Sequence, residues 1–262
     1  MKYSEKRLFF RYPFRSVVQL LFLIVFLVLV FSLWGVWGVH NLCPWAVVEV
    51  PVLMLRLKLG LFYVAGLIIG LLGIWATLYY PRPFCGWVCP LGTLFDFIGD
   101  VGAKMGLSAR RIPHWLNEKM RYFAFGVMAL LIVVTLWKGF LACTVVCPVF
   151  WICTAGKLTI PALTILILLA MFILSIRVKR GFCRYICPYG ALTSMFVPMS
   201  RRVLRVNVEL CISCRVCSRV CPMGIDLLLN FEVGSAHCIS CFECAKACPR
   251  GGIHWERRKR RS

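Results

Sequence analysis

The sequence predicts a mainly α-helical membrane protein with four transmembrane helices, arranged as two parallel hairpin repeats, and a small cytoplasmic α+β domain after them. Three observations support this fold class: 61% of the 262 residues are apolar, the apolar residues form long stretches, and the 16 cysteines recur at fixed spacings. A stretch of about 20 apolar residues allows a helix to cross the bilayer core, which is about 30 Å thick.

The predicted transmembrane helices come from four apolar stretches. They are Val17–Val39, Leu59–Tyr80, Tyr122–Ala142 and Leu158–Ile176. The first stretch follows basic residues, as a secretory signal does, but it exceeds the apolar core of a signal, about 7–15 residues, and no small-residue cleavage site follows it. We therefore expect it to be retained as a membrane anchor.

The formal net charge of +21 indicates topology rather than nucleic-acid binding, because of where the charges lie. Lys and Arg are concentrated before the first stretch, between the second and the third, and after the fourth. This positive-inside pattern predicts a multi-pass protein of the bacterial inner membrane with both termini in the cytoplasm. Membrane lipid is an expected partner, and nucleic acid is not.

The expected domains follow this topology. The first hairpin repeat with its inner loop covers residues 1–121, the second repeat 122–200, the α+β domain 201–255 and a tail 256–262. The tail sequence is ERRKRRS, and its positive charge is expected to attract the anionic inner leaflet.

The α+β domain contains two complete cysteine runs, CISCRVCSRVCP from Cys211 and CISCFECAKACP from Cys238. Their spacing, C-x2-C-x2-C-x3-C-P, is that of bacterial ferredoxins, in which the fourth cysteine of each run ligates the other cluster. The predicted ligands of the two [4Fe–4S] clusters are Cys211, Cys214, Cys217 and Cys248 for one, and Cys238, Cys241, Cys244 and Cys221 for the other. Zinc or disulfides are the alternatives; the two complete copies disfavour zinc, and a reducing cytoplasm disfavours disulfides.

A second pair of motifs follows the two predicted hairpins, FCGWVCPLG from Phe84 and FCRYICPYG from Phe182. Parallel hairpin repeats would bring both motifs to the cytoplasmic surface of the membrane. The cysteines that would meet there are Cys85, Cys89, Cys183 and Cys187. Four thiolates suit a third cluster, and we expect the glycine of each motif to let the backbone turn closely beneath it. The alternatives are a redox thiol pair or inert buried thiols.

The remaining cysteines are expected at the outer membrane face. They are Cys43, Cys143, Cys147 and Cys153. They could hold a fourth cluster, or they could form disulfides, because that side of the membrane is oxidising.

Two ionisable residues flank the outer end of the first hairpin, His40 and Glu49. Oxidation of a quinol releases protons as well as electrons, and these side chains could accept the protons. The alternative explanation for both residues is interfacial solvation or a structural hydrogen bond. Ionisable residues are almost absent from the predicted spans themselves, which disfavours an ion pump.

Paired FCxxxCPxG motifs after apolar hairpins, followed by a two-cluster ferredoxin domain, resemble the NapH-type membrane ferredoxins, the quinol-dehydrogenase membrane subunits of periplasmic nitrate reduction. The MauN proteins of methylamine oxidation, the nitrous-oxide reductase regulators and the polyferredoxins of cbb3-type oxidase assembly share these motifs. The resemblance covers the chain from the first span to Pro249. It implies a subunit of a larger oxidoreductase complex that moves electrons between the quinone/quinol pool and a periplasmic partner, often itself an iron–sulfur protein. An electron-donating maturation or reactivation factor for a metalloenzyme is the alternative function.

Overall fold

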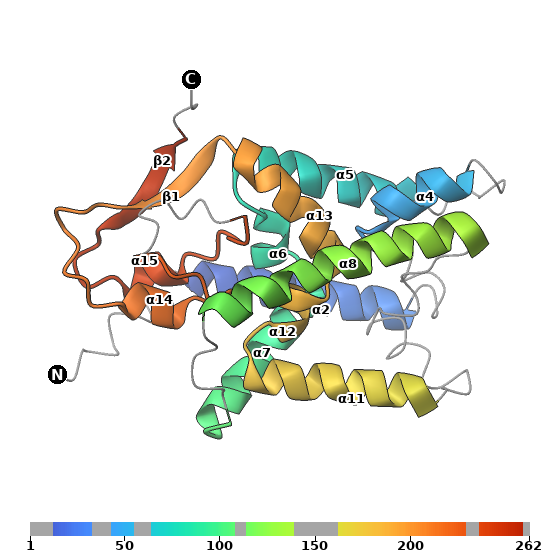
Figure 1. Ribbon diagram of the computed structural model, residues 1–262, viewed down its shortest axis with the longest axis horizontal. Coiled ribbons are helices and arrows are strands. Elements are labelled where there is room, and N and C mark those ends of the chain that lie inside the picture. The colour runs from blue at the N-terminus through green and yellow to red at the C-terminus, as the bar shows by residue number, and fades with distance from the viewer. Residues whose placement is uncertain are drawn as a thin grey trace.

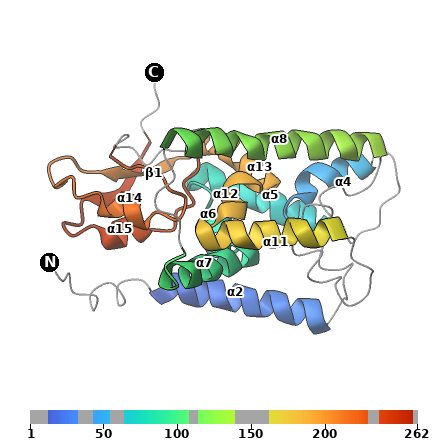
Figure 2. The same ribbon diagram turned by 60° about the horizontal axis from the view of Figure 1, so that its bottom comes forward.

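A computed structural model describes residues 13–32, 43–54, 64–107, 114–138, 162–228 and 236–258 of the chain. Within these residues the protein is mainly helical, with one two-stranded antiparallel sheet, so the mainly α prediction is confirmed. Long helices lie side by side over most of the molecule, and the sheet and two short helices form one end of it (Figures 1 and 2).

The apolar helices are α2 (Pro13–Ser32), α4 (Ala46–Met54), α5 (Val64–Tyr79), α8 (His114–Lys138) and α11 (Ala162–Arg177). Among the described residues, one stretch, Trp115–Trp137 of α8, is long and apolar enough to cross a membrane; the apolar helices Phe14–Val28 and Val64–Tyr79 are shorter. The four-span arrangement therefore stays a prediction. The expected boundary after residue 121 falls inside α8.

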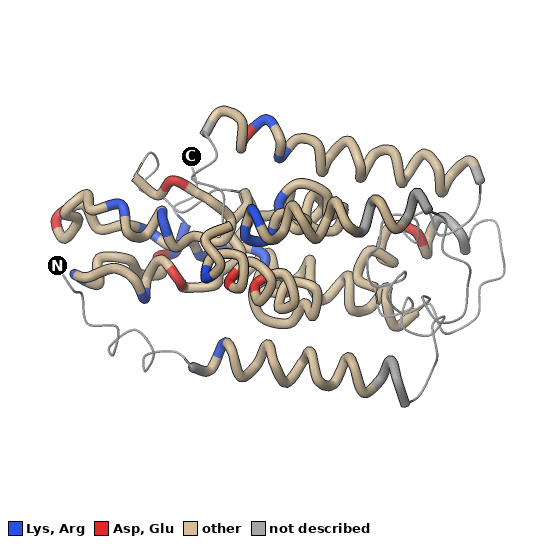
Figure 3. The backbone as a smooth tube through the Cα atoms, turned by 90° about the horizontal axis from the view of Figure 1, so that it is seen from below, with Lys and Arg blue, Asp and Glu red and all other residues tan. Residues whose placement is uncertain are grey.

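Charged residues are distributed unevenly along the molecule. Figure 3 shows Lys, Arg, Asp and Glu gathered toward the end that carries the sheet, whereas the opposite end of the described helices is almost free of them. This polarity separates an apolar helical part from a basic end.

The two FCxxxCPxG motifs have the same local fold. In the first, α6 (Pro83–Trp87) is followed by α7 (Pro90–Lys104); in the second, α12 (Gly181–Tyr185) is followed by α13 (Pro188–Phe196). The second cysteine of each motif is the N-cap of the longer helix, with φ/ψ of −64/115° at Cys89 and −60/114° at Cys187. The proline after it occupies the first helical turn, where its fixed φ and missing N–H are well tolerated.

The sheet end is built from β1 (Arg202–Val206) and β2 (Ile253–Arg257), paired from Arg202 with Arg257 to Val206 with Ile253. Two five-residue helices lie between β1 and β2 in the sequence: α14 (Val216–Val220) and α15 (Glu243–Ala247). They pack against each other. Its core side chains include Leu204, Met223, Leu227 and Ile239, each at most 2% exposed. These elements position the two cysteine runs.

Candidate iron–sulfur sites

The first ferredoxin-type cavity lies between the turn after β1 and the start of α14. It has a volume of about 20 Å³, and its cysteines are Cys211, Cys214, Cys217 and Cys248. This set contains three cysteines of the first run and the fourth cysteine of the second run. We call this space cavity 1.

The second cavity, cavity 2, also has a volume of about 20 Å³ and lies beneath the sheet. Its cysteines are Cys221, Cys238, Cys241 and Cys244. The structure therefore brings together both sets of four cysteines that the ferredoxin spacing rule predicts, with the fourth cysteines exchanged.

The backbone turns in the same way at equivalent positions of the two runs. Ser213 and Arg215 in the first run have φ of 50° and 56°, and Ser240 and Phe242 in the second have φ of 51° and 62°. Left-handed backbone is uncommon for residues other than glycine and persists where the surroundings determine it. The conformation bends each run around its cavity.

A third cavity, cavity 3, lies between the two FCxxxCPxG motifs and has a volume of about 100 Å³. The four cysteines of the motifs line it together with a fifth, Cys43. Its other walls are mainly apolar and include Trp45, Phe84, Leu131 and Phe182. The two motifs, about a hundred residues apart in the sequence, thus form one enclosure.

Each motif is preceded by a buried arginine whose side chain reaches the glycine of the other motif. Arg82 and Arg180 stand three residues before the first cysteine of their own motif, both with left-handed backbone (φ 43° and 56°). A Cβ at Gly190 would lie 2.6 Å from Arg82 Nη2, and one at Gly92 would lie 3.3 Å from Arg180 Nη2. A Cβ at Gly92 would also lie 3.0 Å from the Cys85 carbonyl oxygen, and one at Gly190 3.3 Å from the Cys183 carbonyl oxygen. The motif glycines therefore allow the close backbone approach that the sequence suggested, and they also make room for the arginine of the opposite motif.

The two arginines have different electrostatic surroundings. Arg180 donates to both Asp96 oxygens, at 2.7 and 2.6 Å, and to the Cys85 carbonyl at 2.7 Å. Arg82 is 2% exposed, its Nε has no hydrogen-bond partner, and its Nη2 is 4.0 Å from Cys85 Sγ. A buried cation needs a compensating negative charge, and Arg82 has no carboxylate partner among the described residues. An anionic group in cavity 3, such as an iron–sulfur cluster with four thiolates, would supply that charge.

Two thiols of cavity 3, Cys89 and Cys187, are poor acids without a metal. Burial, reinforced by the neighbouring Cys85, raises the pKa of Cys89 and of Cys187 to about 12. Both thiols are therefore protonated at neutral pH, which disfavours a reactive pair made of these two cysteines. Metal ions displace such protons when they bind, and the donor set thus fits an iron–sulfur cluster.

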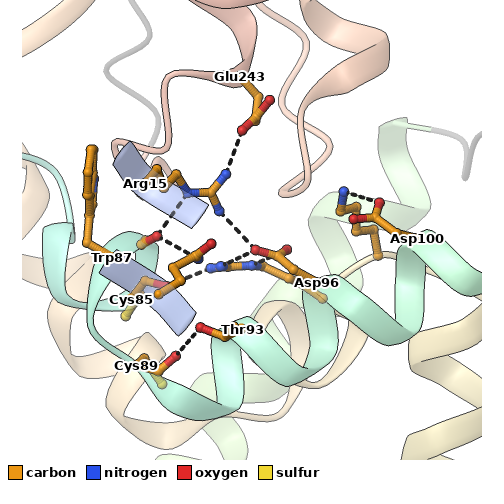
Figure 4. A network of polar contacts seen from close by, with 12 residues as sticks. Arg15, Cys85, Trp87, Cys89, Thr93, Asp96, Asp100 and Glu243 are labelled. Carbon is orange, nitrogen blue, oxygen red and sulfur yellow. Dashed lines mark hydrogen bonds and ion pairs between the residues drawn. The ribbon is translucent and has the colours of Figure 1, made fainter. Parts of the chain in front are cut away.

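A network of ion pairs connects the motifs to the cysteine runs (Figure 4). Arg15 of α2 contacts Asp96 at 2.9 Å and Glu243 of α15 at 2.6 Å, and its Nε donates to the Gly86 carbonyl at 3.1 Å. Burial would raise the pKa of Asp96, but Arg180 and then Arg15 hold it below its ordinary value. Asp96 is therefore the anion that joins α2, α7 and α12.

Cavity 2 is docked directly against the first motif. Trp87 Nε1 donates to the Ser240 carbonyl at 3.0 Å, and Ser240 Oγ donates to the Pro81 carbonyl at 2.6 Å. A Cβ on Gly86 would clash with the carbonyl oxygen of Ile239. Cys85 of cavity 3 also packs against the apolar cluster that includes the cavity 2 cysteines.

Glu49, one of the two predicted proton acceptors, is 1% exposed and accepts a hydrogen bond of 3.2 Å from Thr135 Oγ1. It follows Trp45, a wall of cavity 3, by one turn of α4. His40 lies outside the described residues, so the structure does not test whether the two come together.

The expectation that Cys43 lies apart at an outer face differs from the structure, which places it on the wall of cavity 3. The reason is that the chain folds back at Cys43: α4 begins at Ala46, packs against α5 and α8, and buries Trp45 to 1% exposure. Its expected companions Cys143, Cys147 and Cys153 lie outside the described residues. In the part of the chain that is described, no three Cys, His, Asp or Glu residues form a group that could hold a single metal ion.

The sequence reasoning missed Arg15, Arg82, Asp96 and Arg180. Two of them carry a signal, because extending the motif alignment by three residues shows RPFC and RGFC, with arginine at the same position. Asp96 and Arg15 have no repeat partner and could not be found in this way.

Comparison with protein families supports iron–sulfur chemistry in both halves of the chain. The family model of a 4Fe-4S binding domain matches twice, at residues 62–108 and 160–207, which contain the two FCxxxCPxG motifs. The family model of a 4Fe-4S dicluster domain matches residues 203–249, which contain both ferredoxin runs. These matches and the cysteine-lined cavities define the class: the chain is an iron–sulfur protein with ferredoxin-type domains.

Several known proteins are similar over slightly more than half of the chain. An uncharacterized protein of Methanocaldococcus jannaschii is 32% identical over 58% of this chain and 63% of its own length. The putative electron transport protein YccM of Escherichia coli is 31% identical over 57% of this chain and 43% of its own. The ferredoxin-type proteins NapH of Haemophilus influenzae (29% over 54% of this chain and 47% of its own) and MauN of Methylobacillus flagellatus (28% over 55% and 50%) also match.

The chain is thus an iron–sulfur electron-transfer protein related to NapH and MauN, and the resemblance that its motifs indicated is confirmed. The match spans less than two thirds of each of these relatives. No solved structure matches the chain significantly.

Proposed function

We propose that this protein is a multi-pass subunit of the bacterial inner membrane that moves electrons between the quinone/quinol pool and a periplasmic redox partner. Three [4Fe–4S] clusters would carry the electrons. Two are held by the cysteines of cavities 1 and 2, and the third by Cys85, Cys89, Cys183 and Cys187 of cavity 3. Each bound cluster supplies one-electron exchange without bond rearrangement.

The observation that carries this proposal is the order of the three cavities. Cavity 2 lies between the others, because it shares the α14–α15 unit with cavity 1 and packs against Cys85 of cavity 3. A series of adjoining redox sites is what stepwise electron transfer needs, and a sensor or a store would not need it.

The surfaces of the helices support a membrane location. The described parts of α2, α5, α8 and α11 expose large apolar side chains, including Leu20, Leu21, Ile24, Ile68, Leu71, Leu72, Phe123, Leu130, Val133, Leu166, Leu169 and Ile173. Exposed apolar surface of this extent is typical of contact with lipid. With the positive-inside pattern, it favours four spans with both termini and the ferredoxin domain in the cytoplasm.

The quinone would bind near α4 in this scheme. Glu49 and His40 are the candidate proton acceptors, since two protons leave a quinol with its two electrons. Glu49 suits this role because it lies one helical turn from Trp45, and Trp45 lines the cavity whose cluster would exchange electrons with the quinone.

The test is anaerobic measurement of iron and acid-labile sulfide per chain, with EPR spectra of the reduced protein. We expect about twelve irons, from three cubanes of four. Cys183→Ala should lose about four of them and keep the ferredoxin signals, and Cys211→Ala should lose a ferredoxin cluster and keep the third. An iron content of about eight in the unmodified protein would limit the clusters to the ferredoxin domain and refute the third site.

A further inference from the structure

Cavity 1 is at the free end of the molecule. Figures 1 and 2 place α14 and the turn after β1 at the end opposite to α4. Of the cysteines that the structure describes, Cys214 alone is exposed. A cluster in cavity 1 would therefore have one ligand at the surface, whereas the cysteines of cavities 2 and 3 are buried or partly buried.

Apolar side chains surround this exposed ligand. Val208 is 60% exposed, Leu210 41% and Ile212 54%, and the last two also line cavity 1. Three exposed aliphatic residues within five positions of a turn are a small apolar patch of the kind that transient protein partners use.

The border of this patch is basic. Arg215 and Arg250 line cavity 1 and are exposed, and neither forms an ion pair among the described residues. Glu209 is the exposed acidic residue of the same turn. Asp226 is turned inward, where it accepts hydrogen bonds from Ser218 Oγ at 3.0 Å and from the Leu228 N–H at 3.2 Å. The surface around Cys214 is therefore apolar at its centre and positive at its border.

We propose that this surface docks a small acidic one-electron carrier protein, of the ferredoxin or flavodoxin kind, from the aqueous phase. The proposal rests on the proposed function, because it adds to that electron path a further terminus at the ferredoxin domain, on the cytoplasmic side. The carrier gives up one electron and is oxidised by one unit, and the cluster held by Cys211, Cys214, Cys217 and Cys248 takes up one; no bond or proton is transferred. Negative side chains around the carrier's redox group would meet the two arginines, while aliphatic contacts exclude water.

A protein partner suits this surface better than a lipid headgroup does. The turn after β1, which carries the patch, lies at the end opposite to α4, beyond the long helices (Figure 1). A weak encounter with steering by charge is the common mode of redox pairs, whose interfaces bury less than about 1,200 Å².

The experiment is stopped-flow reduction of the purified, cluster-loaded protein in neutral lipid nanodiscs, with a chemically reduced acidic ferredoxin as the probe. Methyl viologen radical is the second reductant, since it needs no docking surface. The matched variants are Arg250→Glu and Arg257→Glu, two exposed arginines of the same domain. Arg257 is at the far end of β2 from Ile253, about 13 Å along the strand.

We expect Arg250→Glu to slow reduction by ferredoxin about tenfold at low salt, and Arg257→Glu to slow it less than about twofold. The rate for the unmodified protein should fall with salt, and neither variant should change the iron content. Arg250→Glu should slow reduction by viologen much less than reduction by ferredoxin, because a charge change on the wall of cavity 1 acts on the cluster with either reductant, whereas the docking surface serves ferredoxin alone. Equal effects of the two variants, or a rate that salt does not change, would overturn the docking surface alone. Failure of viologen to reduce the unmodified protein would overturn the proposed function as well. If Arg250→Glu matters only in anionic vesicles, its partner is lipid and the proposal is wrong.

Discussion

At the scale of single residues, Arg82 is a buried cation facing thiols, and this predicts a redox effect. A nearby positive charge favours the more negative, reduced form of a cluster. Arg82→Gln should therefore lower the reduction potential of the third cluster, by roughly 60 mV if the lost interaction is worth about 1.4 kcal/mol. A redox titration followed by EPR measures this directly.

Arg82→Lys is the control, because it keeps the charge near Cys85 while losing the guanidinium geometry. It should restore most of the potential. An unchanged potential in Arg82→Gln, with full iron content, would show that this arginine does not face the cluster.

The residue scale also shows what the sequence could predict. The cysteines were found because spacing alone identifies them, including the exchange of Cys221 and Cys248 between runs. Arg82 and Arg180 were missed because the contacts of an arginine before a cysteine motif cannot be predicted until it is known that the two motifs pack against each other. The contacts of Gly92 and Gly190 with these arginines were missed for the same reason, since each arginine comes from the opposite repeat.

At the scale of elements, Asp96 joins α2, α7 and α12 through two arginines with side chains at most 8% exposed. Asp96→Asn would leave Arg15 and Arg180 without their shared anion. Breaking a buried pair in this way costs about 3–5 kcal/mol of unfolding free energy. Thermal unfolding in detergent, followed by circular dichroism, should show the loss as a lower transition temperature.

Asp100→Asn is the matched control, because its pair with Lys179 is exposed and should be worth about 0–1 kcal/mol. The pH dependence has a definite sign: the pKa of Asp96 is lowered in the folded protein, so its contribution is present above the ordinary value of 3.8 and is lost as pH falls through the folded value. Equal destabilisation by the two substitutions would contradict the central role of Asp96.

The contact between α6 and the second cysteine run is equally specific. Gly86→Ala would place a Cβ against the Ile239 carbonyl, which is backbone and cannot turn aside. We expect a cost of about 1–3 kcal/mol and a partly detached ferredoxin domain, detectable as faster proteolysis between the two parts. Gly126→Ala in α8, whose Cβ would meet no atom within 4 Å, should be neutral or slightly stabilising.

At the scale of the whole molecule, hydropathy and repeat alignment predicted the helical class and the meeting of the two motifs. They did not predict the position of Cys43. Hydropathy identifies which segments cross the membrane, but it does not show that α4, which begins just after Cys43, packs against α5 and α8 and so brings Cys43 to cavity 3. They also could not show that cavity 2 rests on α6. That arrangement depends on Ser240, Trp87 and Arg15, whose partners lie 71 to 228 residues away.

The order of the cavities predicts how electron transfer through the whole molecule responds when the cluster at one end of the series, in cavity 3, is lost. If electrons pass from cavity 1 through cavity 2 to cavity 3, Cys183→Ala should leave the ferredoxin clusters reducible by dithionite but stop electron transfer to a quinone analogue in proteoliposomes. We expect the rate to fall at least about a hundredfold, because the cluster nearest the proposed quinone site is then missing from the series. Cys183→Ser, which keeps an oxygen ligand, should retain more iron and a higher rate. Quinone reduction at the normal rate without the third cluster would place the quinone beside the ferredoxin domain instead, and the electron path would end at cavity 2.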